Sequence, residues 1–390
     1  MKTCLIAPAQ STHTQRWVNF YLGSNLDVFV ISAEDYEIPG VKVYLLKRNT
    51  SKGKNRTNKR FSFKNIIKKI AYNRALNQLY FIRGLWFLYR ESRYRDKIKR
   101  IIRKEKPDIV HAFESIPFGF YGAKQDFEVP FLVSIWGSDI VQFPKKSFIF
   151  RNATKKILKK AKVIFCTSRF LGRKVKNYLS KSDYAKIKIV PFGIDIERFN
   201  PEKFTKDKDR VFTLGFIKHF KEIYAPEDVV KAFFLVSKKI PDSHLIMIGD
   251  GDLKDELKRL VKKLKLQDKV ELLDYIPYEK VPSYLSKMDV FLMPSLHDSF
   301  GVSAIEAQAM QVPVVATNVE GIPEAIQDKK TGFLVPVHSP EKIAEKVLLL
   351  ARNRNLRLKM GERGREFVKE NYVWERNAGV VLKVYEEIIS

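Results

Sequence analysis

The chain has 390 residues, more than one hydrophobic core usually supports, so we expect two domains. With 45% hydrophobic and 30% charged residues, it can bury a substantial core and keep a soluble surface. The two cysteines, Cys4 and Cys166, sit in apolar, strand-like runs, which favours buried thiols in a reducing compartment over a disulfide framework or a metal site. No apolar run has the length of a signal peptide or of a segment that spans a bilayer, so we expect a cytoplasmic protein.

The positive charge is large and regional. The net charge is +28, and no Asp or Glu occurs between Glu37 and Glu91, where 14 Lys and Arg residues lie. Such a stretch predicts a polyanionic partner, either phospholipid, a lipid pyrophosphate or nucleic acid.

Two basic segments within residues 42–104 carry apolar faces at helical spacing. The first face consists of Phe63, Ile66, Ile67 and Ile70, and the second of Tyr94, Ile98, Ile101 and Ile102. Basic amphipathic helices of this kind suit an anionic membrane interface, so we expect peripheral binding on the inner face of the cell membrane. The alternative is that both faces pack on the domain core.

Apolar, β-type runs alternate with helical patterns along almost the whole chain. Several runs are apolar at every position, which is typical of strands covered on both faces, and the alternation predicts doubly wound parallel sheets. The expected strands are residues 3–7, 27–32, 41–46, 108–112, 131–135, 163–167, 187–191, 211–215, 244–248, 270–273, 290–293, 312–316 and 332–335.

A polar segment, residues 200–210, separates the first seven strands from the other six and predicts a linker. We therefore expect an α/β fold with two Rossmann-like domains, residues 1–200 and 201–371, facing each other across a cleft. A last helix in residues 372–390 is expected to pack back toward the first domain. Ligands of such sheets bind at the carboxyl ends of the strands.

The most informative segment is residues 294–309, where a strand runs into a short loop and a helix begins near Phe300. Exposed amides at a helix start carry partial positive charge, so a pyrophosphate can bind there without a metal. Gly301 lets the backbone approach the phosphates closely. Asp298, in the loop, can reach a sugar, and Glu306, about two turns further on, can bind vicinal hydroxyls such as those of ribose.

This segment resembles the Glu-x7-Glu element of glycosyltransferase family 4, whose members are retaining, metal-independent enzymes with the GT-B fold. The resemblance covers the whole chain, strongly in the second half and loosely in the first. Further segments that resemble the family, in the same order, are residues 191–201, 248–251, 313–316, 321–326 and 330–336.

The resemblance implies that Glu306 binds the donor ribose and that Asp298 contacts the transferred sugar. The pyrophosphate is then expected at the backbone amides that open the helix. The implied donor-binding set is Gly215, Ser299, Phe300, Gly301, Val302 and Glu306. Asp298 stands where the family usually has Glu, which shortens its reach. Gln311 and Glu320 replace frequent glycines at turns, where we expect local backbone adjustment.

A departing nucleoside diphosphate needs positive charge aimed at its phosphates. The family places an Arg and a Lys in the loop that here spans residues 215–224. Alignment on the following helix puts Lys218 at the Arg position. The Lys position falls on Ile223 or Tyr224, so Lys221 is the nearest substitute. Lys218, Lys221 and Asp298 are the expected catalytic residues, with no cofactor and no metal.

The acceptor is expected to meet the first domain. His13 and Arg16 follow the first strand and can face the cleft, although a capping or packing role for His13 stays open. His111 ends the fourth strand, and because Phe113 replaces the second His of many relatives, a structural role for His111 is favoured over a catalytic one. Asp139, after the fifth strand, is a candidate acceptor-side group.

These features predict a retaining hexosyltransferase that moves a sugar from a nucleotide-diphosphate sugar to a saccharide or lipid-linked acceptor in cell-surface glycan biosynthesis. One alternative is another GT-B enzyme, such as a nucleotide-sugar 2-epimerase, but the sugar-contacting loop favours transfer. The other is a basic nucleic-acid-binding protein, suggested by charge alone. No recognised binding module supports it, so no nucleic-acid partner is expected.

Overall fold

The computed structural model describes residues 1–46, 89, 92–123, 128–205 and 211–390. The chain divides into two compact units, which we call unit 1 (Met1–Val190 with Val381–Ser390) and unit 2 (Pro191–Val380). The division after Val190 comes earlier than residue 200, so residues 191–200 belong to unit 2. The last helix, α16 (Trp374–Ile389), contributes residues to both units.

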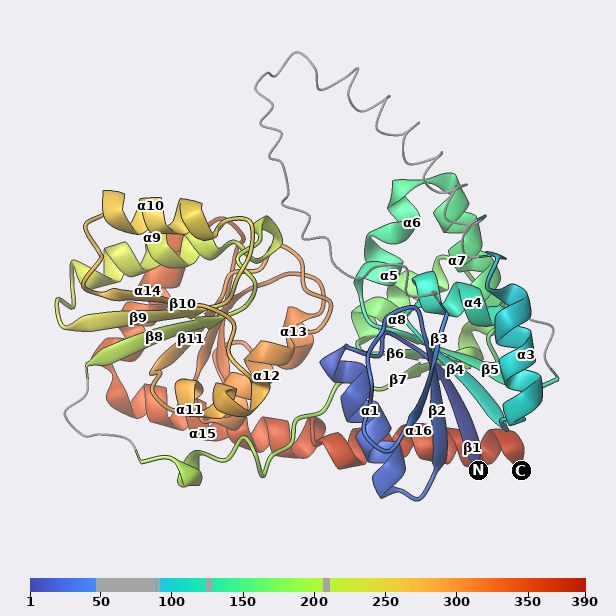
Figure 1. Cartoon of the computed structure of the whole chain (residues 1–390). Helices are drawn as coiled ribbons and strands as arrows, with labels where there is room; N and C mark the ends of the chain where they lie inside the picture. The colour runs from blue at the N-terminus through green and yellow to red at the C-terminus, as the bar shows by residue number, and fades with distance from the viewer. Residues whose placement is uncertain (47–88, 90–91, 124–127, 206–210) are drawn as a thin grey trace, which may run out of the picture. The chain divides into compact units, whose positions relative to one another are not determined.

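Unit 1 is built on a seven-stranded parallel sheet in the order β3-β2-β1-β4-β5-β6-β7 (Figure 1). The order reverses between β1 and β4, which makes the carboxyl ends of these strands the expected ligand position. The strands are β1 (Lys2–Ile6), β2 (Asp27–Ser32), β3 (Lys42–Leu45), β4 (Ile109–Phe113), β5 (Phe131–Ile135), β6 (Val163–Cys166) and β7 (Ile187–Ile189).

Helices cover both faces of this sheet. One face packs against α3, α4, α7 and α8 in a single apolar cluster. On the other face lie α1, where the Trp17 ring is 6.1 Å from that of Phe113, and the end of α16. The helices are α1 (Thr12–Gly23), α3 (Arg95–Glu105), η2 (Ser115–Gly119), α4 (Phe120–Ala123), α5 (Ser138–Val141), α6 (Phe143–Lys146), α7 (Phe148–Lys160), α8 (Arg169–Lys176) and η3 (Lys181–Lys186).

Helix α3 contradicts one membrane prediction. Its apolar residues Ile98, Ile101 and Ile102 are 0–7% exposed and belong to the unit 1 core, so they cannot enter a bilayer. The alternative of core packing is the correct one for this helix, because the same spacing serves both purposes. The other predicted face, Phe63 to Ile70, lies outside the described residues.

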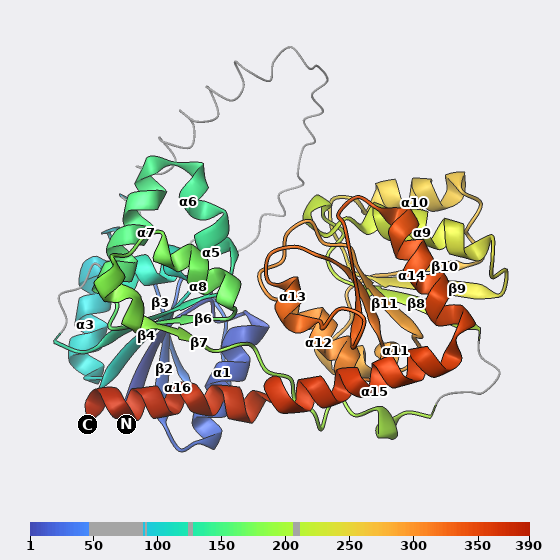
Figure 2. The same cartoon turned by 180° about the vertical axis from the view of Figure 1, so that it is seen from behind.

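Unit 2 is a six-stranded parallel sheet in the order β10-β9-β8-β11-β12-β13, with the reversal between β8 and β11. Helices α9, α10 and α14 supply the core on one face, and α11 and α12 lie on the other (Figures 1 and 2). The strands are β8 (Phe212–Ile217), β9 (Ser243–Ile248), β10 (Val270–Leu273), β11 (Val290–Met293), β12 (Val314–Thr317) and β13 (Gly332–Val335). The helices are η4 (Pro201–Lys203), η5 (Glu222–Tyr224), α9 (Pro226–Ser237), α10 (Lys254–Lys263), η6 (Tyr278–Lys280), α11 (Val281–Leu285), α12 (Val302–Ala309), α13 (Ile322–Ala325), α14 (Pro340–Arg352) and α15 (Arg354–Asn371).

All thirteen expected strands are present and parallel, with ends shifted by at most a few residues. Both cysteines are free and buried, as expected. Of the helices in the described ranges, none is both long and apolar enough to cross a membrane.

Candidate functional site

The candidate site of unit 2 lies where its strand order reverses. Lys218 directly follows β8, and Asp298 lies in the loop after β11, the strand that pairs with β8. Because parallel neighbouring strands end at the same edge, these two loops meet at the position where doubly wound sheets bind ligands.

Lys218 and Asp298 form an ion pair in which Lys218 Nζ donates to Asp298 Oδ2 over 2.5 Å. The two side chains are 15% and 13% exposed, so water screens the pair only in part. Burial, the largest single effect, lowers the pKa of Lys218, but the charge and hydrogen bond of Asp298, together with Tyr224 and Glu306, raise it above its usual value. The lysine also lies over the ring of Tyr224, 4.4 Å from its centroid.

The same carboxylate holds the start of α12. Asp298 Oδ1 accepts hydrogen bonds from the backbone amides of Phe300 (3.1 Å) and Gly301 (2.8 Å). Burial favours a higher pKa for Asp298, but the charge of Lys218 and these hydrogen bonds hold it below its usual value. The Asp298 carboxylate thus accepts hydrogen bonds from Lys218 and from two of the backbone amides that the sequence analysis assigns to a pyrophosphate.

Two glycines permit this tight loop. Gly301 has φ +93°, which a side chain would strain, and it directly precedes α12. A Cβ at Gly321 would lie 1.9 Å from the carbonyl oxygen of Ser299, so only glycine lets that segment pass the loop. The amide of Gly321 donates to the carbonyl of Asp298.

Glu306 lies in the middle of α12 and is 8% exposed. Its Oε1 accepts a hydrogen bond from the Tyr278 hydroxyl over 2.9 Å, and its charge also raises the pKa of Lys218. The structure therefore brings Glu306, Lys218 and Asp298 into one electrostatic group. Tyr278, from η6, is a part of the site that the sequence analysis missed, because no motif links it to α12.

Other predicted residues take different places. Gly215 lies inside β8, where a Cβ would be 1.8 Å from Met288 Sδ, so close packing against Met288 requires glycine at this position. Lys221 is exposed, and Asp298 pairs with Lys218 instead. Ser299 and Val302 are half-buried at the α12 start.

Gln311 and Glu320, which replace frequent glycines of the family, keep the left-handed backbone conformation that glycine favours. Gln311 has φ +57° and Glu320 has φ +48°, both in the left-handed region. Each costs on the order of 1–2 kcal/mol relative to glycine. The Glu320 carboxylate also pairs with His297 Nδ1 over 2.9 Å, beside the candidate loop.

In unit 1, two predicted acceptor-side residues are buried and hydrogen-bonded within the unit. His111 is fully buried, and its ring contacts the Tyr385 hydroxyl over 2.5 Å and the Ser134 hydroxyl over 2.9 Å. Burial lowers its pKa to about 3, so the ring is neutral. Its assignment to the acceptor is wrong, and the structural role favoured by the sequence fits these contacts.

Asp139 is likewise 1% exposed. Its carboxylate accepts from the backbone amides of Ser115 (2.8 Å), Gly137 (2.8 Å) and Trp136 (3.3 Å). It therefore ties the loop after β4 to the loop after β5. A group buried in this way does not contact an acceptor, and this assignment is corrected as well.

Other unit 1 groups at this edge are partly accessible. His13 and Arg16, on α1, are half-buried, and the His13 ring lies 5.5 Å from that of Trp136. Burial, followed by the charge of Arg16, lowers the pKa of His13 to about 4. Glu114, just after β4, is half-buried; burial, followed by the charges of Asp139 and Glu34, raises its pKa to about 8.

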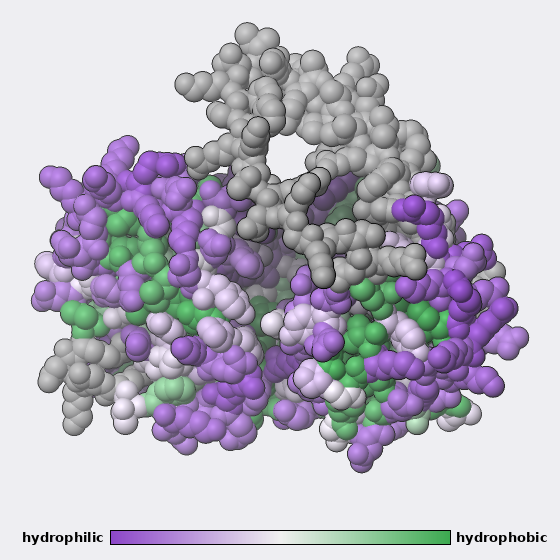
Figure 3. Space-filling view, in the orientation of Figure 1, coloured by the Kyte–Doolittle hydropathy of each residue, from purple (hydrophilic) through white to green (hydrophobic). Residues whose placement is uncertain are grey.

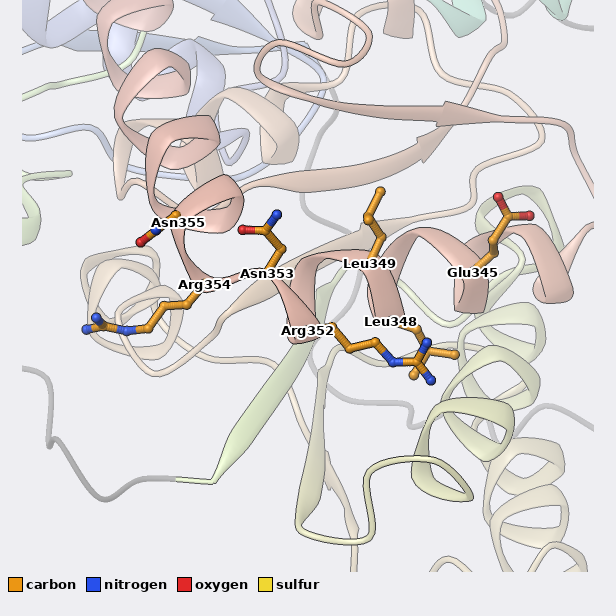
Figure 4. A pocket seen from close by; sticks show the side chains of 7 residues that line it. All are labelled: Glu345, Leu348, Leu349, Arg352, Asn353, Arg354 and Asn355. Carbon is orange, nitrogen blue, oxygen red and sulfur yellow. The ribbon is translucent and has the colours of Figure 1, made fainter.

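A surface pocket in unit 2 is formed by residues at the junction of α14 and α15 (Figure 4). None of its residues belongs to the candidate site. The lining residues are Glu345, Leu348, Leu349, Arg352, Asn353, Arg354 and Asn355. Within the described ranges, no group of three or more His, Cys, Asp or Glu side chains is placed to hold a metal ion.

Comparison with known proteins matches both halves of the chain. Residues 196–367 match the family described as glycosyl transferases group 1, and residues 2–88 and 87–168 match the glycosyl transferase 4-like family. An uncharacterised glycosyltransferase of Methanocaldococcus jannaschii is 31% identical over 295 residues, which are 74% of this chain and 78% of the relative. N-acetyl-alpha-D-glucosaminyl L-malate synthase of Bacillus anthracis is 27% identical over 310 residues, 75% of this chain and 78% of that protein.

The fold agrees with these matches. The solved structure of Anabaena HepE in complex with UDP-glucose superposes with a TM-score of 0.73 at 13% identity, covering 99% of this chain and 100% of that one. Two parallel α/β sheets, each with a central reversal, are the architecture of GT-B glycosyltransferases. The chain belongs to the glycosyl transferases group 1 family and is a GT-B glycosyltransferase.

Proposed function

We propose that this glycosyltransferase takes its sugar from a nucleoside-diphosphate sugar whose pyrophosphate binds between Lys218 and the start of α12. The observation that carries the proposal is the Lys218–Asp298 ion pair at the β8/β11 reversal, with the Phe300 and Gly301 amides on the same carboxylate. Groups that hold a buried carboxylate in this way also suit a phosphate, which presents the same kind of acceptor oxygens.

In this proposal the pyrophosphate displaces Asp298 from Lys218 and the amides, and Asp298 turns toward the sugar. Glu306 then accepts hydrogen bonds from the ribose hydroxyls, beside Tyr278. As the bond between the sugar C1 and the β-phosphate oxygen breaks, C1 bonds to the acceptor hydroxyl oxygen, and the proton of that hydroxyl passes to the departing phosphate. Lys218 stabilises the charge that gathers on this phosphate. The UDP-glucose bound in the HepE structure supports this class of donor.

The test is an assay of nucleoside diphosphate release with a panel of UDP-, GDP- and ADP-sugars and a mixture of simple saccharide acceptors. We expect release with one nucleotide, stimulated by acceptor. Retention is proposed from the family resemblance and is tested by the anomeric proton coupling of the product in NMR. Formation of an epimeric nucleotide sugar without any acceptor would support an epimerase instead.

We also propose that transfer needs no metal or other cofactor, because Lys218 and the α12 amides supply positive charge at the leaving phosphate. Activity is then unchanged by EDTA. Complete loss of activity in chelator, restored by Mn²⁺ or Mg²⁺, would contradict this part of the proposal.

The acceptor is proposed to be a saccharide or lipid-linked glycan of the cell surface, met at an anionic membrane. The net charge of +28 supports such a membrane, and His13 and Arg16 remain the proposed acceptor-side residues of unit 1. Because one relative is an N-acetyl-alpha-D-glucosaminyl L-malate synthase, malate is added to the saccharide acceptors of the assay.

A further inference from the structure

Unit 1 contains a second stretch without acidic residues, in a region that the structure describes. No Asp or Glu occurs between Asp139 and Asp183, and 13 Lys and Arg residues lie in that interval. Most of them are exposed on helices α7 and α8, which lie in front of the unit 1 sheet in Figure 2. This part of the surface is therefore strongly cationic.

Helix α7 has an apolar face that packs in the core and a cationic face that is exposed. Its inner face, which includes Phe150, Ala153, Ile157 and Leu158, belongs to the unit 1 core. Its outer face carries cations and one aromatic residue, and we call it the α7 face. The α7 face consists of the exposed residues Phe148, Arg151, Lys155, Lys156, Lys159 and Lys160.

Phe148 is the unusual member of the α7 face. It is 71% exposed, more than any other large apolar side chain of the described residues. The Ser147 hydroxyl fixes the helix start by accepting from the Phe150 amide, so Phe148 is held at the first turn. Lys145 and Lys146, on the adjoining helix α6, add two more cations beside it. An exposed aromatic ring among lysines resembles the residues with which interfacial helices enter a lipid headgroup layer.

We propose that the α7 face is the surface by which this protein docks on an anionic phospholipid bilayer. The cations of α7 bind lipid headgroups, and Phe148 enters the interface at the end of the helix. Charge complementarity argues for an anionic partner, since five of the six residues that define the α7 face are Lys or Arg and none is acidic. The exposed ring argues for a bilayer over a soluble polyanion, because only a bilayer offers an apolar layer beneath its charged surface. This proposal rests on the membrane contact proposed above and identifies the surface that makes it. Its observations are independent of those at the donor site.

The first experiment compares two helices of similar exposure and different charge pattern. Lys155, Lys156 and Lys159 are changed to Glu in one variant. In the matched control, three exposed lysines of α10 are changed to Glu: Lys258, Lys262 and Lys263. Helix α10 carries Asp255 and Glu256 as well, and its surface is hydrophilic at the upper left of Figure 3. Both variants lower the net charge equally, so they separate a specific surface from overall charge.

Binding is measured by co-sedimentation with vesicles of phosphatidylcholine alone or with 30% phosphatidylglycerol. We expect the native chain to bind the anionic vesicles and to release them as salt rises, since screening shortens the range of the attraction. The α7 variant should lose at least about tenfold in vesicle affinity, because each basic residue near such a surface contributes to binding. The α10 variant should stay within about twofold of the native chain. Equal losses in the two variants would overturn the proposal.

The second experiment tests insertion of Phe148. Because Cys4 and Cys166 are buried, a thiol-reactive, environment-sensitive dye labels the Phe148→Cys variant at residue 148. The matched control is Tyr275→Cys, since Tyr275 is 68% exposed in unit 2 and follows Asp274. On anionic vesicles we expect a blue shift and protection from aqueous quencher at residue 148 and neither at residue 275.

Binding without a blue shift at residue 148 would place the contact elsewhere and overturn the proposal. Binding of heparin through α7, with no binding to vesicles, would favour a soluble polyanion and would also overturn it. Nucleotide titration of each variant keeps the two proposals apart: unchanged donor affinity with lost vesicle binding leaves the donor site intact, and lost donor affinity indicates misfolding.

Discussion

The polar side chains near the strand ends have different partners in the two sheets of this protein. Both are parallel, and both reverse their order at two central strands, where polar side chains lie at the carboxyl ends. In unit 2 these side chains, Lys218, Asp298 and Glu306, are charged and interact with one another. In unit 1, His111 lies within β4 and Asp139 follows β5, and both are buried and hydrogen-bonded to the protein itself.

The difference shows that a strand end marks where a ligand can bind but does not decide which side chain binds it. A side chain remains available only if its partners can be exchanged for a ligand. Asp298 holds groups that a phosphate can also use, whereas Asp139 holds amides deep between two loops. We therefore expect changes at Lys218, Asp298 and Glu306 to alter ligand binding, and changes at His111 and Asp139 to alter stability.

The largest effect is expected for Lys218→Met, which removes the positive charge at the leaving phosphate. We expect kcat to fall by about 10²–10³, the loss typical of one preorganised donor at a developing charge. Lys221→Met, three residues further on and exposed, is the matched control and should stay within about threefold of the native kcat. Steady-state kinetics of the two variants test the assignment, and equal losses would contradict it.

In unit 1, Asp139→Ala should lower the free energy of unfolding by about 3 kcal/mol. The change leaves several buried amides without an acceptor, at about 1–3 kcal/mol each. The control is Asp195→Ala, since Asp195 Oδ1 also accepts from two backbone amides but at an exposed position, and it should cost less than about 1 kcal/mol. Denaturant unfolding measures both. Unchanged stability of Asp139→Ala, with a raised KM for acceptor, would restore Asp139 as an acceptor-side residue.

Glu306→Gln should weaken donor binding by removing a charged acceptor of ribose hydroxyl hydrogen bonds. Such bonds contribute about 1.5–3 kcal/mol, so we expect the Kd of the donor to rise about 10- to 100-fold. Tyr278→Phe, which removes only the hydroxyl bonded to Glu306, should have a smaller effect. Calorimetric titration with the active nucleotide sugar measures both, and an unaltered Kd for Glu306→Gln rejects the ribose assignment.

The last effect concerns pH and Glu114. Burial and neighbouring carboxylates raise the pKa of Glu114 to about 8 from 4.5 when unfolded, so the folded state holds this proton more tightly. The stability contributed by the protonated form is complete below pH 4.5 and is lost as pH rises through 8. Glu114→Gln stays neutral, so its Tm should rise relative to the native Tm across this range. Parallel Tm curves for the two proteins would show that Glu114 titrates normally.

Most of the fold could be predicted from the sequence, because apolar runs of strand length are a local property. The placement of Asp298, Gly301 and Glu306 around the start of α12 could be predicted as well, since these residues are close in sequence. The contacts of His111 with Tyr385 on α16 and of Asp139 with the Ser115 amide could not, because these partners lie on elements distant in the chain. For α3, helical spacing alone did not distinguish a core-facing helix from one that faces a membrane.

The central claim is that a diphosphate takes the place of the Asp298 carboxylate at Lys218 and the α12 amides. Calorimetric titration with UDP, GDP and ADP tests it directly in the native chain, Lys218→Met and Asp298→Asn. The account predicts opposite changes for the nucleotide that binds: weaker binding in Lys218→Met, which loses an attractive charge, and tighter binding in Asp298→Asn, which loses the competing one. Affinities that stay unchanged in both variants, or that fall in both, would contradict it.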